Sequence, residues 1–171
     1  AMGVARCMGI NIMQNFNRPF FSTSISEFWR RWHMSLLNWL TDYVYTPLSY
    51  TFRRLKMRGI WLSILLTFII SGIWHGAGGT HIVWGLTQGF FLCCETAFQT
   101  KRTKMENKYH LRSRWWYIMI CCVVVYLLFT FSQIFGRCSS LSDAWMVIGK
   151  IFSERGSLFV DLSTLVYALF F

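Results

Sequence analysis

The chain has 171 residues, of which 54% are hydrophobic, 19% are aromatic and only 14% are charged. Soluble domains usually carry about 25% charged residues, so the composition indicates a membrane protein and argues against a soluble globular domain. The formal net charge is +10, but the basic residues cluster beside apolar runs. That placement is typical of membrane topology and excludes nucleic acid as the partner.

The first 21 residues combine a short helical start with an irregular segment. Residues 1–14 have neither the long apolar core nor the basic leader of a signal peptide, so we interpret them as an internal helix entered partway. Pro19 disfavours a helical conformation at the residue before it. Residues 15–21 are therefore expected to be extended or turning.

A helix is predicted near residues 25–45. Ser24 and Glu27 fit a capping box, in which a hydroxyl and a carboxylate satisfy free amides at a helix start. His33 lies on the apolar face of this helix, and Arg30 and Arg31 fall to its side. That face is built from residues at three- and four-residue spacing: Ile25, Phe28, Trp29, Trp32, Leu36 and Leu40. An apolar face flanked by cations is typical of a helix lying in the membrane plane or packed at its edge, and Pro47 should end or bend the chain beyond Tyr45.

Two long uncharged runs come after this helix. Residues 59–94 and 115–136 contain no Asp, Glu, Lys or Arg, and a spanning helix needs about 20 apolar residues. The first run has room for two short passes or one broken pair, and the second for one pass. A third apolar segment, residues 158–171, runs into the end of the chain and suggests a fragment.

The basic residues predict which side of the membrane faces the cytoplasm. Residues 53–58 precede the first run, and residues 101–114 separate the two runs; both stretches are rich in Lys and Arg. Basic residues beside spans mark the cytoplasmic side. The two stretches agree if the chain crosses and returns between them.

Several other residues are interpreted as structural, and not as parts of a catalytic, metal or phosphate site. The six cysteines are interpreted as small apolar residues of buried helices, and His110 as a solvated loop residue. His75 and His81 are six residues apart, or about 240° around one helix, so a single helical face cannot present both. With no acidic or thiol group near either, no metal site is expected. Gly76 to Gly79 lack the Lys-Ser/Thr ending of a phosphate loop and are read as a helix break.

His33 and His75 are the candidate functional residues. Each comes directly after a tryptophan in a membrane-embedded context. A histidine on an apolar face is often a hydrogen-bonded core residue, but ionisable groups are costly inside membranes and tend to be kept there for function. A neutral imidazole also suits a general base at physiological pH. An alternative class is a transporter-like or structural segment whose buried histidines relay protons. Such a protein would also use charged residues within its spans, and only Asp161 and Glu95 qualify here.

Two motifs carry a resemblance to a known family. "NFNRPFFSTSISEFWRRWHMSLLNWLTDYVYTPL" and, about thirty residues later, "SGIWHGAGGTHIVWG" resemble the membrane-bound O-acyltransferase (MBOAT) superfamily. The similarity is greatest to the branch that contains alginate O-acetyltransferases and the D-alanyl-lipoteichoic acid transfer proteins. It covers nearly the whole chain and implies an all-α, polytopic transmembrane fold. Against the family's usual length, residues 1–171 would be a partial domain, middle to C-terminal, without the N-terminal and the last spans.

The resemblance also implies a reaction and a site. It implies an acetyl group moved from a cytosolic thioester, acetyl-CoA, toward the hydroxyl of an extracytoplasmic polysaccharide, in the multi-pass inner membrane of a bacterium and with an SGNH-type periplasmic or surface partner. No bound cofactor is expected. His75 would be the general base in a tunnel, and His33 would position the donor or assist proton transfer. The candidate substrate-binding residues are Trp74, Trp29, Trp32, Arg30 and Asp42.

The sequence departs from this branch at two places. Residues 45–58 lack the glycine pair that usually comes after the Tyr-x-Pro-Leu motif, and Gln88 stands where a further histidine is common. D-alanyl transfer to teichoic acid is therefore retained as a second alternative for the reaction.

Overall fold

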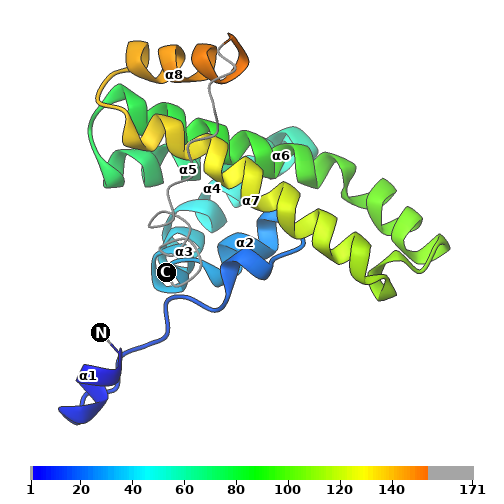
Figure 1. The fold of residues 1–171 in the computed structure, drawn as a ribbon, viewed down its shortest axis with the longest axis horizontal. Coiled ribbons are helices and arrows are strands. Elements are labelled where there is room, and N and C mark those ends of the chain that lie inside the picture. Colours follow the sequence, from blue (N-terminus) through cyan, green and yellow to red (C-terminus); the bar gives the residue numbers. More distant parts are fainter. Residues whose placement is uncertain (1, 154–171) are drawn as a thin grey trace.

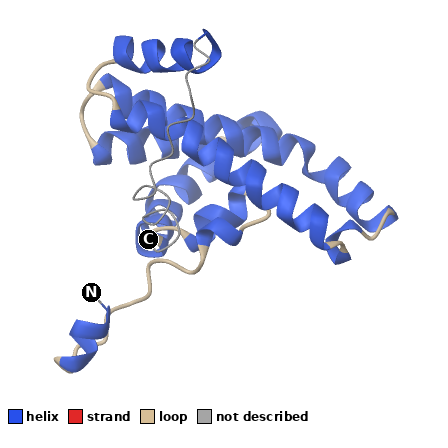
Figure 2. Ribbon diagram, in the orientation of Figure 1, coloured by secondary structure: helices blue, strands red, loops and turns tan. Residues whose placement is uncertain are grey.

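The computed structural model describes residues 2–153, and every regular element in this range is helical (Figure 2). The predicted span at 158–171 and Asp161 lie outside the described residues. In chain order the elements are α1 (Met2–Cys7), a 3₁₀ turn (Pro19–Phe21), α2 (Ile25–Arg31), α3 (Met34–Leu40), a π-helical segment (Thr41–Tyr45), α4 (Thr46–Thr51), a 3₁₀ turn (Arg53–Leu55), α5 (Met57–His75), α6 (Gly79–Lys108), a 3₁₀ turn (Leu111–Ser113), α7 (Trp115–Arg137) and α8 (Leu141–Ser153).

The first uncharged run forms the broken pair that the sequence allowed. α5 ends at His75, three residues intervene, and α6 turns back along it (Figure 1). Glycines set the separation of the two helices: a Cβ on Gly72 would overlap the carbonyl oxygen of His81, and one on Gly85 would overlap that of Phe68. Small residues allow this close backbone approach between membrane helices.

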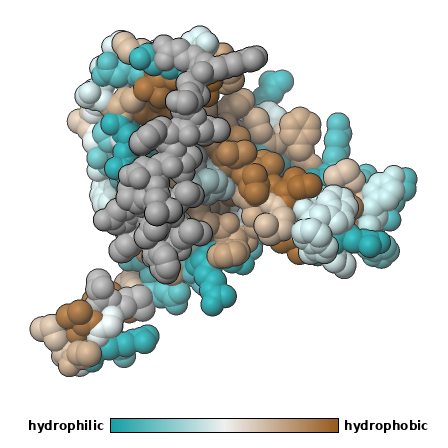
Figure 3. All heavy atoms as spheres, in the orientation of Figure 1, coloured by the Kyte–Doolittle hydropathy of each residue, from teal (hydrophilic) through white to brown (hydrophobic). Residues whose placement is uncertain are grey.

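α7 packs along α6 and leaves much of its own surface bare. α5 and α7 are long and apolar enough to cross a membrane. Figure 3 shows apolar side chains along the face that α7 forms, and its exposed residues include Ile118, Met119, Val123 and Val124. An exposed apolar surface of this kind suits lipid contact, so the all-α membrane fold expected from the sequence is confirmed.

The antiparallel arrangement brings the two basic stretches to one end of the molecule. Residues 53–58 lie at the start of α5, and residues 101–114 lie between the end of α6 and the start of α7. The break at residues 76–78 and the end of α7 lie at the opposite end. The cytoplasmic assignment of the basic end stays a prediction.

The expectation of one continuous helix near residues 25–45 was wrong. α2 ends at Arg31, Trp32 is extended (φ −107°, ψ 128°), and His33 adopts a left-handed conformation (φ 45°, ψ 52°) before α3 begins. Neither proline nor glycine lies at this break. The cause is a segment about twenty residues earlier in the chain.

Asn15 and Asn17 make the hydrogen bonds that a continuous helix would have made for itself. The backbone N–H of Met34 donates to the Asn15 carbonyl at 3.0 Å, and the N–H of Ser35 donates to Asn15 Oδ1 at 3.0 Å. The N–H of Asn17 donates to the carbonyl of Arg31 at 2.9 Å. Because helix ends leave unpaired backbone groups, this irregular segment stabilises the break.

Residues 41–51 continue as helix through Pro47, so of the two outcomes expected there, an end or a bend, the end does not occur. Thr41–Tyr45 widen into a π-helical turn, and Pro47 falls in the first turn of α4, where proline is tolerated. At the N-terminus the expected helix covers only Met2–Cys7, and residues 15–21 are irregular apart from a 3₁₀ turn, as predicted.

Candidate active site

The N-terminus of α2 is capped twice. Within the chain segment, Ser24 Oγ accepts from the N–H of Glu27 at 3.1 Å, which confirms the N-cap predicted at Ser24. Glu27 Oε2 accepts at 2.8 Å from the N–H of Thr23, one residue before the N-cap, instead of the N–H of Ser24 that a capping box would use. From α6, Glu95 accepts from the N–H groups of Ile25 and Ser26 and from the Ser26 hydroxyl. A carboxylate also interacts favourably with the positive end of the helix dipole.

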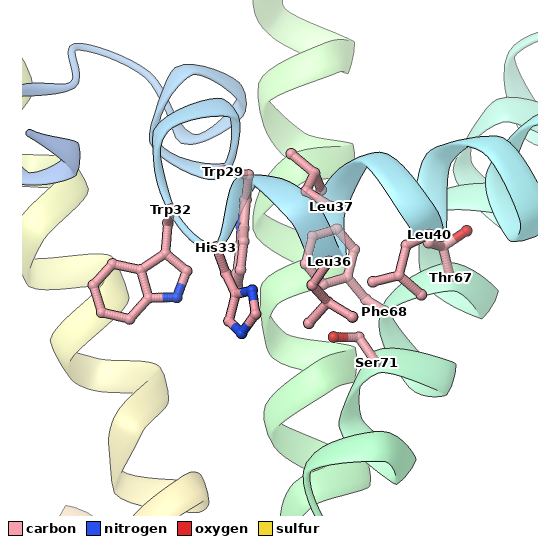
Figure 4. Close-up of a pocket in the computed structure, with 9 residues that line it drawn as sticks. All are labelled: Trp29, Trp32, His33, Leu36, Leu37, Leu40, Thr67, Phe68 and Ser71. Carbon is pink, nitrogen blue, oxygen red and sulfur yellow. The ribbon is translucent and has the colours of Figure 1, made fainter. Parts of the chain in front are cut away.

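α2 leads directly into the first histidine. His33 is the residue before α3, and its Nδ1 is buried without a hydrogen-bond partner among the described residues. Trp29 Nε1 is in the same condition. Both rings line a cavity of about 20 Å³, which Ser71 of α5 completes (Figure 4). This volume suffices for one water or one substrate oxygen.

His75 is the last residue of α5, and the Trp74 ring lies between it and His33. The Trp74 ring lies edge-on to both, with its centroid 6.0 Å from that of His33 and 4.7 Å from that of His75. On the other side, the His75 ring is 5.1 Å from that of Trp84 on α6. The structure therefore brings His33, Trp74, His75 and Trp84 into one aromatic row, whereas Trp32 packs against phenylalanine rings beside it.

His81 belongs to the same site, which sequence reasoning missed. His75 and His81 were treated as residues of one helix, but the break at residues 76–78 places them on two helices. Both now line a cavity of about 270 Å³, together with Trp32, Trp84, Phe129, Gln133, Gly136 and Arg137. The signal available was the glycine run itself, because a break invalidates helical-wheel spacing across it.

The candidate substrate-binding residues divide into two groups. Trp29 and Trp32 line the cavities beside the histidines, and Trp74 lies between the two imidazoles. Arg30 is exposed and lines a separate polar cavity of about 300 Å³ around the start of α2. Asp42 is exposed on the π-helical turn and lines neither histidine cavity.

Gln88, noted in the sequence as a departure, has a structural role. Its side chain is 2% exposed, and Nε2 donates to Ser132 Oγ at 2.6 Å, joining α6 to α7. The Ser132 hydroxyl in turn donates to the Phe129 carbonyl at 2.6 Å.

The charged end of α6 holds a buried ion cluster. Glu106, 2% exposed, accepts from Arg102 Nε, Arg112 Nε and the Tyr117 hydroxyl, each at 2.8 Å. Arg102 also donates to the carbonyl of Thr23 at 2.8 Å, which ties this end to the start of α2. Burial raises the pKa of Glu106, but these hydrogen bonds and charges outweigh it and hold the pKa below its ordinary value of 4.5.

These contacts define what the site can do chemically. The described residues hold no cluster of three or more His, Cys, Asp or Glu able to bind a metal ion. The imidazoles of His75 and His81, in one cavity with aromatic walls, provide a proton acceptor and hydrogen-bonding groups. No charged nucleophile lies beside them among the described residues of the lining. The fold and site thus define a helical membrane protein with histidines at a helix break, suited to proton transfer to and from a substrate.

Comparison with known proteins identifies the family. Residues 1–142 match the model of the membrane-bound O-acyltransferase (MBOAT) family. The chain belongs to this family, and the family expected from its two motifs is confirmed.

The similar proteins are bacterial. The "Probable alginate O-acetylase AlgI" of Azotobacter vinelandii is 35% identical over 167 residues, which are 95% of this chain and 30% of that protein. The "Peptidoglycan O-acetyltransferase" of Helicobacter pylori is 30% identical over 163 residues, 95% of this chain and 29% of that protein. The "Teichoic acid D-alanyltransferase" of Bacillus subtilis is 34% identical over 132 residues, 74% of this chain and 32% of that protein. The chain spans about a third or less of these relatives.

Proposed function

We propose that the protein containing this chain is a membrane O-acyltransferase that moves an acetyl group from a cytosolic thioester to a polysaccharide hydroxyl outside the cytoplasm. In this reaction the hydroxyl oxygen forms a bond to the acyl carbon and the carbon–sulfur bond breaks. The hydroxyl proton passes to the base and then to the leaving thiolate, so that a free thiol and an ester result.

One observation carries the proposal: the shared cavity that His75 enters from the end of α5. A general base must lie within hydrogen-bond reach of the proton that it removes, and a cavity beside an imidazole gives a hydroxyl room to approach. His33 is joined to His75 through the Trp74 ring. It therefore positions the thioester or assists proton transfer.

The charge pattern and the relatives support a donor and a location. Acetyl-CoA is the proposed donor, because basic residues at 53–58 and 101–114 attract its phosphates on the cytoplasmic side. The printed names of relatives include alginate and peptidoglycan acetylation, which supports a cell-envelope polysaccharide as the acceptor. We place the protein in the inner membrane as a multi-pass protein with an SGNH-type partner.

A second reaction remains a candidate on a specific observation. The teichoic acid D-alanyltransferase of Bacillus subtilis is almost as similar as the alginate acetylase over its aligned part. D-alanyl transfer would use the same base and the same bond changes with a different acyl group. The transporter alternative is weakened because Glu95, one of its two charged partners, caps α2 instead of facing a histidine.

The test is acetyl transfer by the full-length protein with His75→Asn. Loss of a general base lowers the rate by about 10²–10⁴-fold, whereas the matched change His110→Asn, in the loop before α7, should leave it unchanged. Acetyl-CoA and a D-alanyl thioester are compared as donors. Near-normal transfer by folded His75→Asn protein would reject the assignment, and loss with His33→Asn alone would reverse the two roles.

A further inference from the structure

His81 is held in place from two directions. Its backbone carbonyl lies against Gly72, one turn before His75, where any side chain would overlap it. Its imidazole rests on the backbone of Gly76: a Cβ there would lie 2.8 Å from both Cε1 and Nδ1 of the ring. The break after His75 is therefore shaped around the His81 ring.

The nitrogens of this ring have little to bind within the described residues. The only hydrogen bond that they make there is a long one of 3.5 Å between Nδ1 and the hydroxyl of Thr80. The ring is half-buried and lines the same cavity as His75. An imidazole that is fixed in position and faces an open cavity is available to a ligand.

The walls of the cavity indicate the chemistry of that ligand. Trp32, Trp84 and Phe129 supply aromatic surface, and Gln133 and Arg137 supply hydrogen-bond donors, and among the described residues no carboxylate belongs to the lining. Apolar walls with a few convergent polar groups are typical of small-molecule sites. The cavity volume of about 270 Å³ leaves room for a group the size of one sugar residue beside the histidines.

The location of the cavity assigns it to the acceptor. α5 ends, α6 begins and α7 ends around it, so it lies at the end of the helices opposite the basic residues 53–58 and 101–114. A cytosolic thioester would approach from the basic end. A hydroxyl from outside the cytoplasm would enter by this cavity.

From these observations we infer that His81 is a second functional histidine, which hydrogen-bonds the acceptor hydroxyl and holds it beside His75. The inference rests on the proposed acyl transfer and adds the residue that binds its acceptor. His75 takes the proton as the oxygen–carbon bond forms, and His81 orients the oxygen without changing its own protonation.

The experiment compares His81→Phe, which keeps a ring but no hydrogen bond, with His81→Gln, which keeps a hydrogen-bonding group. The full-length protein is given acetyl-CoA and an alginate oligosaccharide, with glycerol as a second hydroxyl probe. We expect His81→Phe to raise the acceptor KM about tenfold or more, the effect of leaving one polar group unpaired. The KM for acetyl-CoA should stay within twofold, and His81→Gln should recover most of the loss.

Three results would overturn the inference. They are an unchanged acceptor KM in His81→Phe, an equal rise in the donor and acceptor KM values, and no recovery in His81→Gln. Failure of the proposed function is recognised separately, because wild-type protein would then acetylate neither probe. In that case the role of His81 is tested by thioester hydrolysis, since water is the smallest acceptor for the same cavity. A hydrolysis rate lower in His81→Phe than in the wild type supports the role of His81, and an unchanged rate rejects it.

Discussion

Replacing Glu95 by alanine should detach the start of α2 from α6. The carboxylate accepts from two backbone N–H groups, at Ile25 and Ser26, and from the Ser26 hydroxyl. Loss of a helix cap costs about 0.5–2 kcal/mol, and loss of a hydrogen bond to a charged group costs about 1.5–3 kcal/mol. Ser24 still caps the N–H of Glu27, so we expect a net loss of about 2–3 kcal/mol in the free energy of unfolding.

The assay measures thermal unfolding and acetyl transfer of full-length protein in detergent. Glu95→Ala should lower both the unfolding midpoint and the transfer rate, because α2 leads directly into Trp32 and His33. Glu95→Gln retains an accepting oxygen and should lie between the wild type and Glu95→Ala. Gln99→Ala, one turn further along α6 in the same polar cavity, is the matched control. Unchanged stability in Glu95→Ala would refute the cap, and an inactive but stable Glu95→Gln would indicate a proton-carrying role instead.

Three further outcomes are expected from the packing and the charges. Gly85→Ala should force α5 and α6 apart and lower both stability and acetyl transfer. Gly149→Ala has nothing within 4 Å of its added Cβ, so it should be neutral or stabilise α8 by up to about 1 kcal/mol. Equal effects of the two changes on the thermal unfolding midpoint would contradict the packing argument. Because the pKa of Glu106 is held below 4.5, its ion cluster should stabilise the protein fully above that pH and lose this contribution as the pH falls further. The free energy of unfolding of Glu106→Gln should therefore depend less on pH below 4.5 than that of the wild type. Gln88→Leu should destabilise by about 0.5–1.5 kcal/mol, because the bond from its Nε2 to Ser132 Oγ is lost while that hydroxyl still donates to the Phe129 carbonyl. A double variant with Ser132→Ala should therefore be little less stable than Ser132→Ala alone in denaturation assays.

The long apolar helices could be predicted from the sequence, because their signals are local. The uncharged run at residues 59–94 and the glycines at 76–79 predicted the broken pair, and Ser24 with Glu27 predicted the start of α2. These features depend on residues within one or two turns of each other. The local order of residues was therefore enough to place them.

The site was predicted only in part, because its remaining features depend on contacts between distant segments. His33 lies at a break that the periodicity of residues 25–40 conceals, since the hydrogen bonds that stabilise it come from Asn15 and Asn17. His81 was excluded by a helical-wheel argument that does not apply across a break. Arg30 was selected for its place beside the motif, yet the fold turns it to the polar cavity at the start of α2, away from both histidines.

The hydrogen bonds from Asn15 and Asn17 mean that two motifs separated in the sequence form one structural unit. The Arg-Trp-His turn has no intrinsic reason to leave the helix, so without the asparagine segment residues 25–40 would be expected to relax into a straight amphipathic rod. Transplanting the histidine motif into another scaffold would therefore require both pieces. Only the bond from the N–H of Ser35 to Asn15 Oδ1 uses a side chain, so residue 15 is the position at which a substitution should disturb this unit most.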